Sequence, residues 1–106
     1  MPGIFGIISI DNPSRCREQL KAMHQTMLHE SSYTSGLYIN EDAGLYSGWT
    51  SHRDSFADCM PVFNEKQNNV LLFSGENFPD LHLFDYLKTN NHKFDSSKAD
   101  YLIHLY

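Results

Sequence analysis

The chain opens with Met1-Pro2-Gly3-Ile4-Phe5-Gly6-Ile7-Ile8-Ser9-Ile10, and this stretch decides the fold. The apolar run from Ile4 to Ile10 is rich in β-branched residues, which favours a buried strand. The run is much shorter than the roughly 20 apolar residues that a membrane span requires. We therefore expect the chain to begin with a strand inside its own core, without a leader segment.

The composition is that of a folded domain. A length of 106 residues corresponds to one domain or part of one, and 41% hydrophobic and 13% aromatic residues are enough for a packed core. Acidic residues outnumber basic ones by 13 to 8, which gives a net charge of -5. Because a phosphate-binding surface needs an excess of basic residues, we expect no nucleic-acid partner, and the absence of a long apolar segment predicts no membrane partner.

Cysteines and histidines show no pattern typical of a disulfide framework or a metal site. The two cysteines, Cys16 and Cys59, occur without a signal-peptide pattern, which favours a reduced, cytoplasmic compartment. We expect Cys16 on the polar side of the first helix and Cys59 in a loop, both in surface or packing roles. The six histidines lack ligand spacing, so the sequence predicts no metal site.

Turn and capping residues divide the chain into strands and helices. Asn12 and Pro13 are typical of an N-cap and a first helical position, and they predict a helix that extends to about His29. Ser97 and Asp100 form a capping-box pattern that predicts a last helix. The elements expected between these helices are a polar loop (31–36), a hairpin (37–39 and 45–50), a second hairpin (61–63 and 70–73) and a helix (79–89). This order indicates an α+β layered fold.

The opening resembles the Met-Cys-Gly-Ile-x-Gly start of class II glutamine amidotransferases, the N-terminal-nucleophile hydrolase domains of asparagine synthetases and related amide-forming enzymes. Met60-Pro61 stands at the family's Gln-Pro turn, and the stretch 74–79 stands at its Asn-Gly-Glu-Ile-Tyr-Asn loop. The family's His-Arg-Gly-Pro-Asp motif is followed shortly by a glycine; here only its ends match, as His29 and Gly36. The stretch 94–106 is similar to the family's Phe...Ser-Asp-x-Glu segment and the helix that follows it. The resemblance implies a truncated αββα sandwich, of which residues 1–106 form the N-terminal part.

The family's nucleophile is missing. In the family Met1 is removed, and the freed cysteine attacks the glutamine amide with its own α-amino group as base. Pro2 occupies this position, and its ring has neither thiol nor hydroxyl, so nucleophilic catalysis cannot start there. We expect no catalytic residue in the chain. A free Pro2 amine acting as a base, as in tautomerases, has no substrate-binding cations near it in the sequence.

Two further parts of the implied glutamine pocket are changed. The family's oxyanion donors are an asparagine side chain and the backbone N–H of the following glycine. Here they are Ser74, whose hydroxyl is too short, and Gly75. The arginine that holds the substrate carboxylate is replaced by Trp49, which we expect to fill the vacated volume; Arg53 is an alternative cation four residues further on.

The implied ammonium site is half kept. Glu76 stands at the position of one family carboxylate, whereas Lys98 stands at the other and would repel an ammonium group. Asp95 or Asp100 is an alternative counterpart of that second carboxylate.

The sequence therefore predicts a degenerate glutaminase-like domain of an asparagine-synthetase-like protein, a family that serves asparagine biosynthesis. We expect it to lack glutaminase activity and to serve a structural or docking role for an ATP-dependent synthetase domain, in cis or in trans. ATP and magnesium belong to that domain, so no cofactor is expected in this chain, and the full-length protein is a candidate homodimer. The alternatives are an active amidotransferase that uses another nucleophile, such as Cys16 or Cys59, and a stand-alone interaction module.

Overall fold

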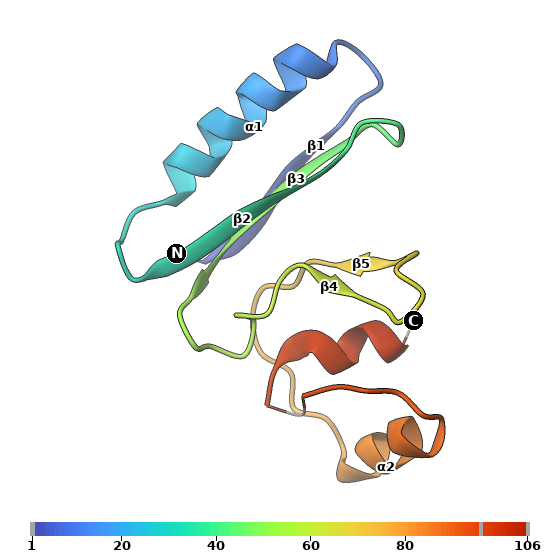
Figure 1. The fold of residues 1–106 in the computed structure, drawn as a ribbon. Helices are drawn as coiled ribbons and strands as arrows, with labels where there is room; N and C mark the ends of the chain where they lie inside the picture. Colours follow the sequence, from blue (N-terminus) through green and yellow to red (C-terminus); the bar gives the residue numbers. More distant parts are fainter. Residues whose placement is uncertain (1, 96, 106) are drawn as a thin grey trace.

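The chain forms a small α+β domain (Figure 1). A computed structural model describes residues 2–95 and 97–105. Its elements, in chain order, are β1 (Gly3–Ile8), α1 (Pro13–Met27), β2 (Tyr33–Asn40), β3 (Leu45–His52), β4 (Val62–Phe63), β5 (Val70–Leu71), α2 (Leu81–Thr89) and the 3-10 helix η1 (Ala99–Leu105). The α+β class predicted from the sequence is confirmed. No helix in the described part of the chain is long and apolar enough to cross a membrane.

A three-stranded antiparallel sheet forms the N-terminal half of the molecule, in the order β1-β3-β2. The predicted strand at the start of the chain is present, but it is buried on one face only. Ile4 and Ile8 are 53% and 84% exposed, whereas Phe5 and Ile7, which lie between them in the strand, pack into the core. The prediction of a fully buried strand is wrong because β1 is an edge strand with alternating burial.

Helix α1 covers one face of this sheet (Figure 1). The Asn12 side chain accepts a hydrogen bond from the Arg15 backbone N–H at 3.2 Å, which confirms the predicted N-cap. Leu20 of α1 is fully buried against Tyr46 of β3, and Cys16 of α1 packs in the same cluster. The prediction that Cys16 lies on the polar side of the helix is wrong, because the first turn of the helix directs this residue toward the sheet, where it has a packing role.

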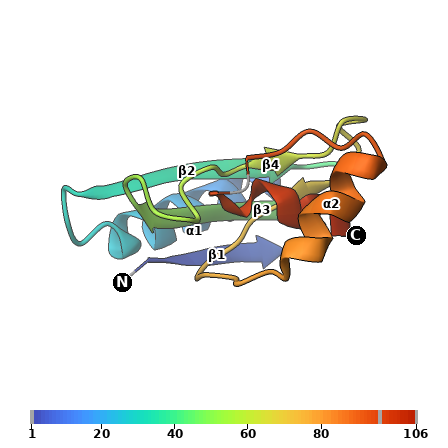
Figure 2. The ribbon, with the colours of Figure 1, turned by 90° about the horizontal axis from the view of Figure 1, so that it is seen from below.

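The β4–β5 hairpin lies on the opposite side of the sheet from α1, and η1 packs against both of its strands (Figure 1). Helix α2 lies beyond η1. The rings of Tyr38 in β2 and Phe63 in β4 meet at 6.1 Å and connect the hairpin to the sheet. The molecule is flat, with extents of 45 × 32 × 15 Å, as the view from below shows (Figure 2).

Tyr101 of η1 is the centre of a second, aromatic core. Its ring is fully buried and makes edge-on contacts with Phe56, Phe84 and Phe94 at centroid distances of 6.0, 5.2 and 6.4 Å. Its hydroxyl accepts a hydrogen bond from the Asn77 side chain at 2.8 Å. Residues from the loop after β3, from α2 and from η1 thus share one cluster.

Element boundaries differ from the prediction in three places. Strand β2 begins at Tyr33 inside the predicted polar loop, because Tyr33 and Thr34 pair with His52 and Ser51 of β3. The second hairpin is shorter than predicted, with two residues in each strand. The last helix is a 3-10 helix, and the predicted capping box does not start it.

Asp95 organises the start of η1 in place of the predicted capping box. Its carboxylate accepts hydrogen bonds from the Ser97 backbone N–H at 2.9 Å and from the Ser97 hydroxyl at 2.6 Å. The Asp100 carboxylate in turn accepts from the Asp95 backbone N–H at 2.9 Å. Because Ser97 and Asp100 both bond to Asp95 rather than to each other, the segment forms a tight turn into η1.

Candidate functional site

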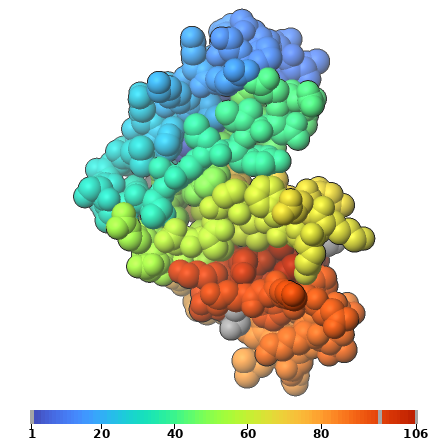
Figure 3. Space-filling model, in the orientation of Figure 1, coloured from blue at the N-terminus to red at the C-terminus, as the bar shows by residue number. Residues whose placement is uncertain are grey.

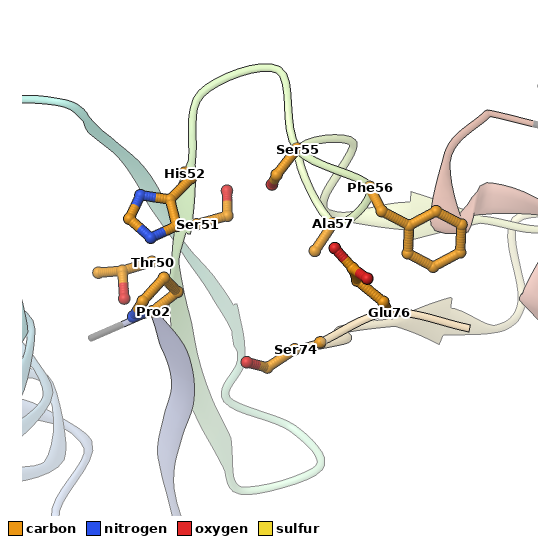
Figure 4. A pocket seen from close by; sticks show the side chains of 10 residues that line it. Pro2, Thr50, Ser51, His52, Ser55, Phe56, Ala57, Ser74 and Glu76 are labelled. Carbon is orange, nitrogen blue, oxygen red and sulfur yellow. The ribbon is translucent and has the colours of Figure 1, made fainter. Parts of the chain in front are cut away.

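A cavity of about 310 Å³ lies between the two halves of the molecule (Figure 4). The space-filling view shows these halves as two lobes with a notch between them (Figure 3). Three segments meet at the cavity: the start of β1, the end of β3 with the loop that follows it, and the loop after β5. The residues that line it are Pro2, Thr50, Ser51, His52, Ser55, Phe56, Ala57, Ser74, Gly75 and Glu76.

Four of the residues singled out from the sequence lie together at this cavity. Pro2 lies on one side, and Ser74, Gly75 and Glu76 lie opposite it, although they are far from Pro2 in the sequence. The Ser74 side chain points toward Pro2, and the Glu76 carboxylate points into the opening (Figure 4). Gly75 has a φ of 118°, a value that L side chains rarely adopt, which explains the glycine in this loop.

Trp49 and Lys98 lie outside the cavity lining. Trp49 is buried on the sheet, with its ring packed over Gly36 of β2, where a Cβ atom would overlap it. Lys98 donates a hydrogen bond from Nζ to the Ser55 carbonyl at 2.9 Å. Lys98 therefore holds the loop that lines the cavity rather than facing the cavity itself.

The alternative counterparts also lie elsewhere. Arg53 is exposed, and its backbone N–H donates to the Ser32 carbonyl at 3.4 Å. Asp95 and Asp100 organise the turn before η1, as described above. Among the described residues that line the cavity, none is an arginine or a lysine.

His52 is the lining residue of greatest chemical interest that sequence reasoning missed. Its imidazole lies edge-on to the Tyr33 ring at 5.0 Å. The neighbouring Thr50 and Ser51 were also missed as site residues. Strand β3 continues beyond Thr50 to His52 and so reaches the mouth of the cavity. A predicted strand that extended to His52 would have brought these residues to the site.

The loop after β3 is fixed by Asp58. One carboxylate oxygen accepts a hydrogen bond from the Thr34 hydroxyl at 2.8 Å, and the other accepts from the Asp54 backbone N–H at 2.7 Å. The Asp54 hydrogen bond is the main reason that the pKa of Asp58 lies below its ordinary value, and the Thr34 hydrogen bond lowers that pKa further. Asp54 itself has a φ of 61°, so the carboxylate holds a left-handed turn at the edge of the cavity.

We expect Asp58→Asn to lower the free energy of unfolding by about 1–2 kcal/mol at pH 7, because the amide replaces two charge-assisted hydrogen bonds. The lowered pKa of Asp58 means that its stabilisation is complete above the unfolded-state pKa and is lost as the pH falls through the folded-state pKa. The difference between wild type and variant should therefore shrink below about pH 4. Urea unfolding at pH 7 and pH 3 measures it, with the exposed Asp42→Asn as control. An equal loss at both pH values would contradict the role of the charge.

Neither cysteine lies in the cavity lining. Both are free thiols; Cys16 is buried in the α1 core, and its Sγ donates to the Asp11 carbonyl at 3.4 Å. Burial raises the pKa of the Cys59 thiol, so it holds less of the reactive thiolate at neutral pH. The structure therefore offers no support for either thiol as a substitute nucleophile.

Comparison of the chain with protein-family models, with curated proteins and with solved structures found no match.

Proposed function

We propose that the chain is a degenerate class II glutamine amidotransferase domain that has lost glutaminase activity and serves as a structural or docking module. The observation that supports this most strongly is the meeting of Pro2 with Ser74, Gly75 and Glu76 at one cavity. The resemblance assigns these four positions to the nucleophile, the oxyanion donors and the ammonium ligand of a glutamine site. The resemblance assigns these residues to one site, and the fold brings them together. This agreement supports the proposal more strongly than the opening motif alone.

The order of layers agrees with this proposal. In space, α1 is followed by the three-stranded sheet, then by the β4–β5 hairpin, and then by η1 and α2 (Figure 1). Helix, sheet, sheet and helix is the order of the αββα sandwich that the resemblance implies. The second sheet has only two short strands, so the proposed sandwich is incomplete.

The cavity lacks most of the chemistry of a glutamine site. Pro2 has no nucleophilic side chain, and the Ser74 hydroxyl is shorter than the asparagine amide that it replaces. Among the described lining residues there is no arginine or lysine to hold a substrate carboxylate. Glu76 keeps its proposed partner, the ammonium group, and Gly75 keeps its backbone N–H as an oxyanion donor. We infer that the cavity is a remnant that no longer processes glutamine.

The uncovered face of β1 supports a docking role. Ile4 and Ile8 project from the face opposite α1, and within the described residues β1 pairs with β3 alone. A partner segment that extended the second sheet would cover these side chains. In the proposal this segment belongs to a synthetase domain, in cis or in trans, which would also hold ATP and magnesium. A stand-alone interaction module remains the alternative.

Ammonia release from glutamine tests the loss of activity. We expect the purified protein to release no ammonia above the enzyme-free rate, because removal of a hydrolytic nucleophile lowers kcat by a factor on the order of 10⁶. Cys16→Ser and Cys59→Ser should leave this result unchanged. Ammonia release that either substitution abolishes would overturn the proposal and identify the thiol as the nucleophile of an active amidotransferase.

A further inference from the structure

Glu65, His92 and His104 converge at one point of the surface, away from the cavity described above. They come from the β4–β5 connection, the turn after α2 and the end of η1. Each offers one ligand atom, and these atoms all lie within 4.8 Å of one another. Nδ1 of His92 lies 3.1 Å from one Glu65 carboxylate oxygen, and Nδ1 of His104 lies 3.4 Å from the other.

The His104 ring is held with an unpartnered nitrogen toward this point. Its side chain is only 5% exposed, and Nε2 donates a hydrogen bond to the Lys93 carbonyl at 3.1 Å. Because a carbonyl oxygen only accepts, the proton of the neutral ring is on Nε2, and Nδ1 carries the lone pair. Nδ1 of His104 is buried and has no hydrogen-bond partner. A buried acceptor without a donor is costly, and its nearest neighbour is another acceptor.

Glu65 and His92 also favour the binding of a positive charge at this point. The Glu65 carboxylate, whose second oxygen lies 3.4 Å from Nδ1 of His104, adds a negative charge at neutral pH. The rings of His92 and His104 lie with their centroids 4.5 Å apart. A proton shared by His92 and Glu65 would satisfy only that pair, and it would leave Nδ1 of His104 facing the second carboxylate oxygen.

We propose that Glu65, His92 and His104 bind a divalent transition-metal ion of the zinc class, with a fourth coordination position left to solvent. Two imidazoles and a carboxylate are ligands that zinc prefers. Tetrahedral zinc with bonds of about 2.1 Å holds its ligand atoms roughly 3.4 Å apart. Nδ1 of His92 lies 3.1 Å from one Glu65 oxygen and Nδ1 of His104 lies 3.4 Å from the other, which is close to this spacing. With a single Glu65 oxygen as ligand, the three ligand atoms lie within 4.8 Å of one another, so small side-chain adjustments would complete the geometry. The Lys93 carbonyl would orient His104 from behind, as hydrogen-bond partners of metal-bound histidines usually do.

The surroundings leave room for the ion and for solvent. A second cavity of about 340 Å³ adjoins the cluster, and three asparagines line it, with Lys66 as the one cationic side chain in the lining. The lining residues are Asn64, Glu65, Lys66, Asn68, Asn69, His92, Ile103 and His104. Lys66 is exposed and free to turn into solvent. The ion would join the β4–β5 connection, the turn after α2 and η1, so its binding would stabilise the C-terminal half.

Titration with zinc alone tests the site, by calorimetry and by thermal unfolding. We expect one ion per chain and, at a hundredfold excess over Kd, a Tm increase of roughly 10 °C. Loss of an outer-shell partner weakens metal binding by about 10–100-fold, so Glu65→Gln and His92→Gln should weaken it at least about 100-fold. Glu18→Gln and His29→Gln, at exposed positions outside the cluster, are matched controls and should bind zinc like the wild type.

Cobalt distinguishes this site from a thiol site. We expect the cobalt complex to show tetrahedral visible bands without a thiolate charge-transfer band, since Cys16 and Cys59 are not ligands. His104→Gln removes a buried ring and could prevent folding, which is why the two less buried ligands, Glu65 and His92, decide the test. Absence of saturable binding, or unchanged binding by Glu65→Gln and His92→Gln, would overturn the proposal. Because the glutaminase-like cavity lies elsewhere, either result leaves the proposed function untouched.

Discussion

Replacing Tyr101 with alanine is expected to lower the free energy of unfolding by about 3–5 kcal/mol. The ring is fully buried and contacts three phenylalanine rings, from the loop after β3, from α2 and from the segment before η1. Its loss would leave a hole among side chains that are themselves anchored on short elements. It would also leave the Asn77 amide without its partner. Urea denaturation monitored by circular dichroism measures the change.

Two substitutions separate the causes of this loss. Tyr101→Phe keeps the ring and removes only the hydroxyl, so it should cost about 1 kcal/mol. Tyr86→Ala removes a tyrosine from the exposed face of α2 and should change stability by no more than about 0.5 kcal/mol. An alanine variant that loses no more stability than the phenylalanine variant would show that the aromatic cluster does not hold the C-terminal half together.

The cavity lined by Pro2 and residues 74–76 depends on this cluster because it lies between two small cores. One core packs α1 on the sheet around Leu20, and the other surrounds Tyr101. The loop that lines the cavity joins them, since the Phe56 carbonyl accepts a hydrogen bond from the Ala99 backbone N–H at 2.8 Å and the Ser55 carbonyl accepts from Lys98. Release of η1 would therefore free this loop and open the cavity.

Local signals in the sequence were sufficient for α1 and α2 but not for η1 or the strand boundaries. Asn12 and Pro13 start α1 through contacts within one turn of the chain, so a short window of sequence contains the needed information. The start of β2 is decided by pairing with β3, a partner distant in sequence. The burial of Cys16 and the 3-10 form of η1 likewise depend on packing and on Asp95, which the capping pattern did not include.

The candidate site was predicted in part for the same reason. Pro2 and the loop 74–76 belong to short motifs, so their counterparts could be assigned without knowing the strands. Trp49 belongs to no short motif, so its assignment as the counterpart of the arginine depends on the length of the connection that follows it. The chain instead extends β3 to His52 and brings residues 50–52 to the cavity. The metal-ligand cluster has no sequence signature, because Glu65, His92 and His104 meet only when the β4–β5 connection, the turn after α2 and η1 pack together.

Adding Ser74→Asn to Pro2→Cys is expected to raise glutamine hydrolysis about 100-fold over Pro2→Cys alone, since one oxyanion donor is worth about 10²–10³ in rate. The first change supplies a thiol at the cavity position of Pro2, and the second supplies a longer donor where Ser74 points toward it (Figure 4). Mass spectrometry must first confirm removal of the initiator methionine, because the mechanism needs the free α-amine as base. Ammonia release at low glutamine concentration gives kcat/KM.

Ser14→Asn in the Pro2→Cys background is the control, because Ser14 lies on the exposed surface of α1. Equal rates for the double variant and this control would contradict the assignment of Ser74 to the oxyanion position. The missing carboxylate clamp weakens glutamine binding in all these variants to the same extent. It therefore lowers each kcat/KM by a common factor that cancels in the ratio, and the ratio reports the hydrogen-bond donor at position 74.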